Sequence, residues 1–261
     1  MAIRKLLLPL QTTATAAAAL STALTAARTW RAHLAVLHVV AARRHEADMR
    51  AMFDRFVADN AIQVAPATPD AEFPTASFVA TTGREAEAVA YEARLADLTV
   101  VPHPASGEDV SSSDALHAVL FESGQPVLIA PRTAPRGGIG TRICLGWNGS
   151  AESASAVLAA LPWLKRAEAV RILWSEEYQR RGPMAPELED YLAAHEIAAD
   201  RMMFRSINNV VGAGLLAGAG EFGADLLVMG AYSHSRLRQL ILGGVTRHVL
   251  EHAAIPLMMH R

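Results

Sequence analysis

The chain of 261 residues is poor in cysteine and in aromatic side chains. Its single cysteine, Cys144, excludes an internal disulfide and favours a reducing compartment, and its place inside the apolar run 141–147 indicates a buried thiol. Aromatic residues make up only 6% of a chain that is 51% hydrophobic, so its cores are built from Ala, Val and Leu. This composition suits two compact α/β units better than one β-rich unit.

A dominant charge and long hydrophobic runs are also missing. The 24 Lys and Arg residues against 26 Asp and Glu residues leave a formal net charge of -2, which provides no basic field for nucleic acid or anionic membrane. No apolar run approaches the roughly 20 residues that span a bilayer. The run after Arg4 and Lys5 stops at Leu10, so we do not interpret it as a signal peptide. We expect a cytoplasmic protein that binds neither nucleic acid nor membrane.

Short apolar runs alternate with helical patterns through the first half of the chain. The runs are typical of parallel strands buried on both faces, and the intervening segments carry apolar residues at helical spacing. Strands are predicted at 3–10, 33–40, 76–81, 98–101 and 125–131, and helices at 13–30, 46–60 and 84–95. The segment 132–140 (RTAPRGGIG) is dense in Pro, Gly and Arg and is predicted to be a linker between domains 1–131 and 141–261.

The same order of elements recurs in the second half. Strands are predicted at 141–147, 169–175, 200–205 and 226–230, helices at 152–164, 186–195 and 209–222, and a final helix and strand after 243. Ala96, Asp97 and Leu98 are echoed by Ala-Asp-Leu at 224–226, and both halves end in a proline-led apolar tail. The pattern predicts two tandem doubly wound α/β domains. Each has a five-stranded parallel sheet, with a ligand crevice at the carboxyl ends of its strands.

A glycine turn near the C-terminus is a candidate anion site. The apolar run 226–230 is followed by a polar, basic loop, the pair Gly243 and Gly244, and a helical pattern. Backbone amides at the start of a helix lack partners, and the helix dipole favours negative charge there. This order of elements predicts a phosphate or nucleotide pocket.

These motifs resemble the universal stress protein family in its tandem form, whose domains are Rossmann-like and similar to the adenine nucleotide alpha hydrolases. The family motif runs Gly, two residues, Gly, nine residues, Gly, then Ser or Thr. The spacing is kept here, although Ser233 stands at the second Gly and Gly244 at the hydroxyl. The family's Asp-Gly-Ser after the first strand is here Asn148 followed by Gly and Ser.

The resemblance implies that the second half binds ATP or another adenine nucleotide, with Mg²⁺ if the nucleotide carries it. It assigns Asn148 and Ser175 to the base and Gly230, Ser233, Gly243 and Gly244 to the phosphates. Thr246 is a candidate for the missing hydroxyl. The asparagine can still hydrogen-bond a purine, but without the charge of the family's carboxylate. The fifth strands of the two halves, at 127–130 and 256–259, are expected to pair within one chain, and a further homodimer is left open.

The first half departs further from the motif and is expected to be degenerate. Gln11 replaces the Asp, Pro102 stands at the first motif glycine, and no glycine pair precedes the next helix. Two functions therefore compete: a stress-associated regulatory protein that binds nucleotide in its second half, and a scaffold or dimerisation module with both pockets decayed. An enzyme is the weaker alternative, with at most slow ATP hydrolysis, because no P-loop lysine or positioned base is evident. His248 and His252 are four residues apart, but without a third ligand they do not predict a metal site.

Overall fold

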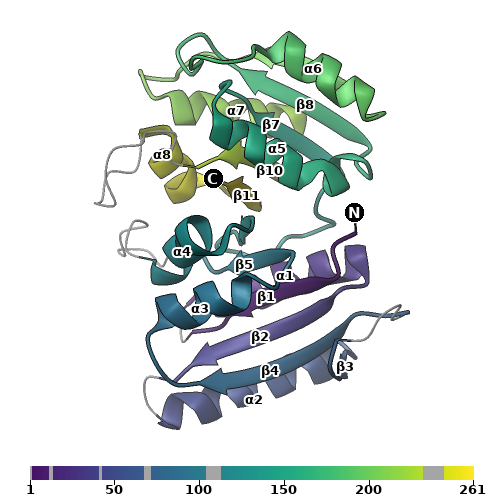
Figure 1. Ribbon diagram of the computed structural model, residues 1–261, viewed down its shortest axis with the longest axis vertical. Coiled ribbons are helices and arrows are strands. Elements are labelled where there is room, and N and C mark those ends of the chain that lie inside the picture. Colours follow the sequence, from purple (N-terminus) through teal and green to yellow (C-terminus); the bar gives the residue numbers. More distant parts are fainter. Residues whose placement is uncertain (1, 12–13, 41–42, 68–71, 104–112, 232–243) are drawn as a thin grey trace. The chain divides into compact units, whose positions relative to one another are not determined.

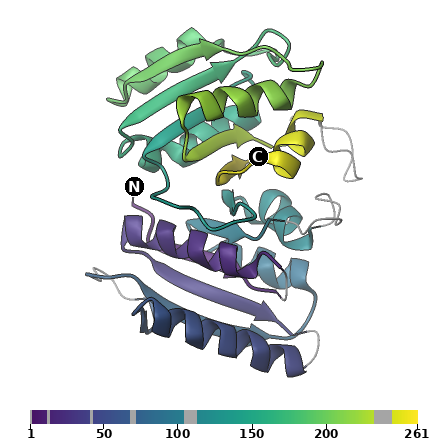
Figure 2. The same cartoon turned by 180° about the vertical axis from the view of Figure 1, so that it is seen from behind.

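The computed structural model describes residues 2–11, 14–40, 43–67, 72–103, 113–231 and 244–261. They form two compact units, residues 1–138 and 139–261. Each unit is a parallel sheet with helices on both faces (Figures 1 and 2). The predicted α/β class with two tandem doubly wound domains is confirmed.

The first unit has the strand order β3-β4-β2-β1-β5-β6, and its strand pairs are parallel. Figure 1 shows α3 and α4 in front of this sheet, and the reverse view in Figure 2 shows α1 and α2 on its other face. The elements are β1 (Lys5–Pro9), α1 (Ala16–Trp30), β2 (His33–Val39), α2 (Arg43–Asp59), β3 (Gln63–Val64), β4 (Thr75–Thr81), α3 (Glu85–Ala93), β5 (Leu98–Val101), α4 (Asp114–Ala118), the π-helical turn η2 (Val119–Ser123) and β6 (Val127–Ile129).

The second unit has the strand order β11-β10-β7-β8-β9, again with parallel pairs. Helix α5 lies in front of the sheet in Figure 1, and α7 lies in front of it in Figure 2. The elements are β7 (Arg142–Gly146), α5 (Ala151–Leu164), β8 (Ala169–Trp174), α6 (Ala185–Ala194), β9 (Ala199–Met203), α7 (Val211–Phe222), β10 (Leu226–Gly230), α8 (Gly244–His252) and β11 (Leu257–His260).

The first sheet contains one strand more than the sequence predicts. Gln63 and Val64 form β3 and pair with Thr75 and Ala76 of β4. A two-residue strand just before the prolines at 66, 69 and 74 has too short an apolar pattern to be recognised in the sequence. The other predicted strands and helices are present, with ends that shift by at most three residues.

An aspartate holds together the starts of two adjacent strands in each unit. The Asp225 carboxylate precedes β10 and accepts hydrogen bonds from the backbone amides of Gly140 (2.9 Å), Thr141 (3.0 Å) and Arg142 (3.1 Å). In the first unit, the Asp97 carboxylate accepts from the amides of Arg4 and Lys5 at 2.7 and 3.0 Å. The Ala-Asp-Leu echo in the sequence is therefore a repeated structural clamp.

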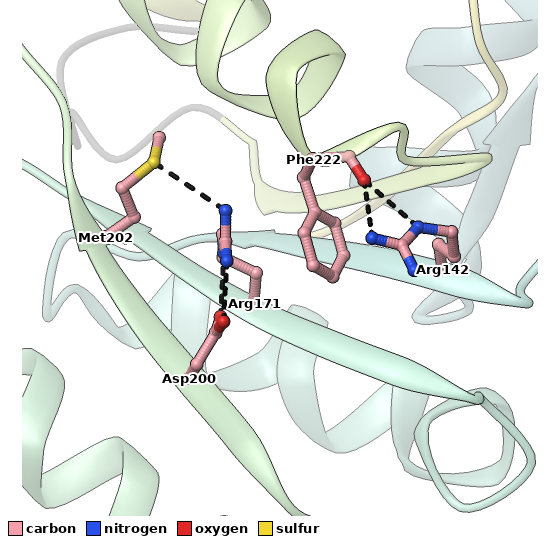
Figure 3. A network of polar contacts seen from close by, with 5 residues as sticks. All are labelled: Arg142, Arg171, Asp200, Met202 and Phe222. Carbon is pink, nitrogen blue, oxygen red and sulfur yellow. Dashed lines mark hydrogen bonds and ion pairs between the residues drawn. The ribbon is translucent and has the colours of Figure 1, made fainter.

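Two arginines pack on one phenylalanine near the starts of β7 and β8 (Figure 3). The guanidinium carbons of Arg142 and Arg171 lie 4.3 and 4.5 Å from the centroid of the Phe222 ring. Arg142 also donates to the Phe222 carbonyl oxygen at the end of α7, and Arg171 forms a double hydrogen bond with Asp200 of β9 at 2.6 and 2.7 Å. The cluster fixes the C-terminus of α7 on three strands, at the end of the sheet opposite the expected crevice.

We predict that Asp225→Asn lowers the free energy of unfolding by about 1–3 kcal/mol, because three backbone amides lose a charged acceptor. Urea unfolding followed by tryptophan fluorescence measures this, since Trp147, Trp163 and Trp174 all lie in the second unit. The matched control is Asp190→Asn, which alters an exposed carboxylate on α6. Equal losses in the two variants would contradict the clamp.

His33 is expected to make the stability of the first unit depend on pH. It is buried, with Nδ1 2.9 Å from the Thr75 hydroxyl and Nε2 2.9 Å from the Ser77 hydroxyl. Burial, and then the nearby charge of Lys5, lower the pKa of His33 below its usual 6.5. Below pH 6.5 the unfolded chain therefore takes up a proton that the folded chain resists, so stability is lost as pH falls.

We expect His33→Gln to reduce the fall in unfolding free energy between pH 7.5 and 5.5. Urea titrations at several pH values measure the slope. The same substitution at the half-exposed His195 is the control. A slope that His33→Gln leaves unchanged would show that the buried imidazole does not cause it.

Candidate functional site

The candidate site lies at the carboxyl ends of β7, β8 and β10, where the chain turns into helices. After β7 the chain forms the turn Asn148–Gly149, and Gly149 has a φ of +75°, which favours glycine. The Asn148 Oδ1 accepts from the Ser150 amide at 3.1 Å, and the Ser150 hydroxyl caps α5 by accepting from the Ser153 amide at 3.2 Å. A side-chain turn followed by an N-cap thus fixes both Asn148 and the start of α5.

Three of the predicted residues are buried polar side chains at this edge. Asn148, Ser175 and Thr246 are only 4%, 2% and 7% exposed. In the part of the chain that the structure describes, the Asn148 Nδ2 and the hydroxyls of Ser175 and Thr246 make no hydrogen bond. None of these three polar atoms is among the side-chain nitrogen and oxygen atoms that are fully buried without a partner, so they reach a surface on which a polar ligand or ordered water can bond to them. They come from the ends of β7 and β8 and from the first turn of α8.

The predicted glycines have different surroundings. A Cβ on Gly230 would lie 2.6 Å from the backbone carbon of Glu152 and closer still to the Ser153 nitrogen, so this glycine lets α5 pack on the end of β10. Gly244 begins α8, and a Cβ there would have nothing within 4 Å. Ser233 and Gly243 lie outside the described residues. Gly230 therefore has a packing role that does not require a ligand.

The loop between β8 and α6, residues 175–184, folds over the Asn148–Gly149 turn. The Arg180 amide donates to the Asn148 carbonyl oxygen at 2.7 Å, and the Trp147 indole donates to the Pro183 carbonyl oxygen at 3.0 Å. Gly182 packs directly on the Gly149 backbone. These contacts cannot be predicted from the sequence, because Gly182-Pro183 predicts a turn but not the segment on which the turn packs. The loop thus holds the backbone of Arg180 against that of Asn148.

The histidine pair on α8 has a packing role. The rings of His248 and His252 are stacked with centroids 4.1 Å apart, and a Cβ on Gly212 of α7 would lie 2.9 Å from the His248 Cβ. Burial, followed by the proximity of His252, lowers the pKa of His248. No group of three or more metal-ligating side chains occurs among the described residues.

The equivalent edge of the first unit carries acidic groups at two helix N-termini. Glu85 begins α3 and Asp114 begins α4. Burial raises the pKa of Glu85, a hydrogen bond from Gln11 lowers it, and the negative charge of Asp114 raises it. Carboxylates already occupy the positions where helix amides favour an anion, so this edge is poorly suited to phosphate.

The second half of the chain matches the model of a known family. Residues 141–261 match the model of the Universal stress protein family. A universal stress protein from Archaeoglobus fulgidus has a TM-score of 0.73 at 14% identity, with 98% of this chain and 96% of that chain covered. A protein of unknown function from Pseudomonas aeruginosa has a TM-score of 0.64 at 14% identity, with coverage of 99% and 92%.

A third structure, a universal stress protein in complex with cAMP, has 19% identity and a TM-score of 0.38 over 51% of this chain and all of that chain. No curated protein matches the chain. No helix in the described residues is long and apolar enough to cross a membrane.

We predict that Gly230→Ala destabilises the protein by about 1–3 kcal/mol, because the new methyl group collides with the backbone of α5. Gly244→Ala is the matched control and should be neutral or slightly stabilising, since its methyl group enters open space at a helix start. Urea unfolding of the two variants measures the difference. Equal stability of both variants would contradict the close packing at Gly230.

Proposed function

Since residues 141–261 belong to the Universal stress protein family, we propose that the chain is a tandem universal stress protein that binds an adenine nucleotide in its second half. In this proposal it acts in the cytoplasm as a stress-associated regulator, through conformation and partners. The first half is a degenerate domain that binds no nucleotide. Mg²⁺ would enter with the phosphates of the nucleotide.

The observation that carries this proposal is a set of polar side chains on largely buried residues at one sheet edge, without a hydrogen-bond partner among the described residues. The Asn148 Nδ2 and the Ser175 hydroxyl follow adjacent strands, as two groups contacting one base would. The Thr246 hydroxyl lies in the first turn of α8, where the free amides and the helix dipole favour phosphate. Ser233 and Gly243 are assigned to the phosphates by motif position alone.

The chemistry of these groups favours binding over turnover. Amides and hydroxyls orient a ligand through hydrogen bonds, but at neutral pH they do not serve as general bases. Cys144 is fully buried in β7, and burial raises the pKa of its thiol to about 12, so it offers no thiolate nucleophile. Loss of the family's carboxylate at Asn148 removes a charge-assisted hydrogen bond and weakens affinity.

A nucleotide-independent scaffold is the second candidate, and the loop 175–184 is the observation that favours it. This loop is bonded to the Asn148 carbonyl oxygen and packed on Gly149, so protein contacts already cover this turn without a ligand. In a scaffold, the retained glycine at 230 would serve only the packing of α5. The two functions differ in one measurable property, a stabilisation of the folded chain by nucleotide.

We predict that ATP, ADP, AMP or cAMP at millimolar concentration, with Mg²⁺, raises the melting temperature. A ligand at 100 times its Kd adds about 2.7 kcal/mol to the free energy of unfolding. Thr246→Val should weaken binding about 2- to 13-fold, which corresponds to one lost hydrogen bond of about 0.5–1.5 kcal/mol.

Thr99→Val is the matched control, because it removes a buried, unpaired hydroxyl from β5 in the first half. It should leave nucleotide affinity unchanged. No thermal shift with any of the four nucleotides would favour the scaffold. Equal loss of affinity in both valine variants would contradict the assignment of Thr246.

A further inference from the structure

Strand β4 has an open edge along most of its length. It pairs with β2 over residues 76–81 and with β3 only at Thr75 and Ala76 (Figure 1). The Thr81 carbonyl oxygen accepts from the Val40 amide after β2, whereas the Ala76 carbonyl oxygen accepts from the Ala65 amide after β3. Because backbone groups alternate sides along a strand, odd-numbered residues of β4 bond toward β2 and even-numbered residues face outward.

Two residues therefore present unpaired backbone groups. The N–H and C=O groups of Phe78 and Ala80 point away from β2, and β3 has already ended at Val64. In the described part of the chain, no strand lies beyond β4 at these two residues. An open edge of this kind is a template for another strand.

Strand β4 itself carries no charged side chain, although the Arg50 guanidinium of α2 lies 4.7 Å from the centroid of the Phe78 ring on one face of the strand. Residues 75–81 (TASFVAT) carry no charge, and Val79 is 53% exposed on the face opposite α2. The corresponding outer strand of the second unit, β9, carries Asp200 and Arg201, and Arg201 forms an ion pair with Glu189 of α6. Charges of this kind block strand addition. Of the two outer strands compared, β4 and β9, only β4 thus lacks charged side chains that would block strand addition.

We propose that β4 pairs antiparallel with β4 of a second copy of this chain, about a two-fold axis at Val79. Phe78 of each copy then lies opposite Ala80 of the other, and each such pair exchanges two N–H···O=C bonds. In this register the unpaired N–H and C=O groups of Phe78 and Ala80 bond to those of the other copy, because the two residues lie on either side of Val79. A charge-free strand meets its own copy without repulsion between like charges, which is the complementarity that selects a second copy as the occupant.

The length of the paired segment is limited at both ends. β3 covers the edge at Thr75 and Ala76, and β4 ends at Thr81. The buried interface area is therefore small. We expect a dimer that forms only at high protein concentration and whose copies associate and dissociate rapidly. It joins first units, so it does not require the nucleotide site of the second unit.

A cysteine at the axis tests the register. The two Val79 residues form a non-hydrogen-bonded pair with a Cα separation of about 4.5 Å, which a disulfide can bridge. The natural Cys144 is fully buried, so Val79→Cys introduces the reactive thiol. Mild oxidation of the full chain should convert this variant to a covalent dimer.

Register controls are available on the same strand. Ser77→Cys alone should remain monomeric, because its two copies are about 13 Å apart. Ser77→Cys mixed with Thr81→Cys should give the mixed dimer, because these residues lie opposite each other. Equal cross-linking of Val79→Cys and Ser77→Cys, or none by Val79→Cys at 100 μM, would overturn the proposal.

Sedimentation without cross-linking gives a second test. The apparent mass of the wild-type chain should rise from 27.9 kDa toward twice that value as its concentration rises. The Val79→Lys variant should stay at the monomer mass, because the lysines of the two copies would lie opposite each other and repel. Met203→Lys, at an exposed position on β9, is the control and should still dimerise. Failure of Val79→Lys to weaken association, or a wild-type chain that stays monomeric at 100 μM, would overturn the proposal. Both outcomes are independent of nucleotide binding.

Discussion

The close approach of α5 to the end of β10 organises the candidate site. Only a glycine at 230 lets the backbone of Ser153 lie against this strand end. The contact positions the start of α5, and with it the Asn148–Gly149 turn, beside the strand that leads to the phosphate motif. The position of Asn148 at this edge is therefore supported by a steric constraint that requires no ligand.

This constraint explains why a retained motif does not by itself establish a ligand. The first motif glycine is needed for packing at 230, so its presence fits both a nucleotide-binding domain and a scaffold. The side chains of Asn148, Ser175 and Thr246 separate the two functions better, because their polar atoms have no hydrogen-bond partner among the described residues and can bond to a ligand. The first unit differs at the same edge, where carboxylates begin α3 and α4.

The fold could be predicted from the sequence because apolar runs and helical spacing are local signals. The sequence predicts the strand at 98–101 and the end of a helix at Trp30 to the residue, whereas it does not predict β3, because two residues carry no pattern. Contacts distant in sequence could not be predicted. The bond from Arg180 to Asn148 and the clamp at Asp225 join segments 32 and about 85 residues apart. The site assignments thus remain predictions, and Ser233 and Gly243 lie outside the described residues.

Mass spectrometry of the gently purified, undenatured chain tests the central claim most directly. We expect one adenine nucleotide per chain, released on denaturation, because among the described residues carboxylates begin α3 and α4 of the first unit but not α8 of the second. A chain that carries no nucleotide and acquires none at millimolar concentration would contradict the claim. Two nucleotides per chain would contradict the assignment of the first unit as degenerate.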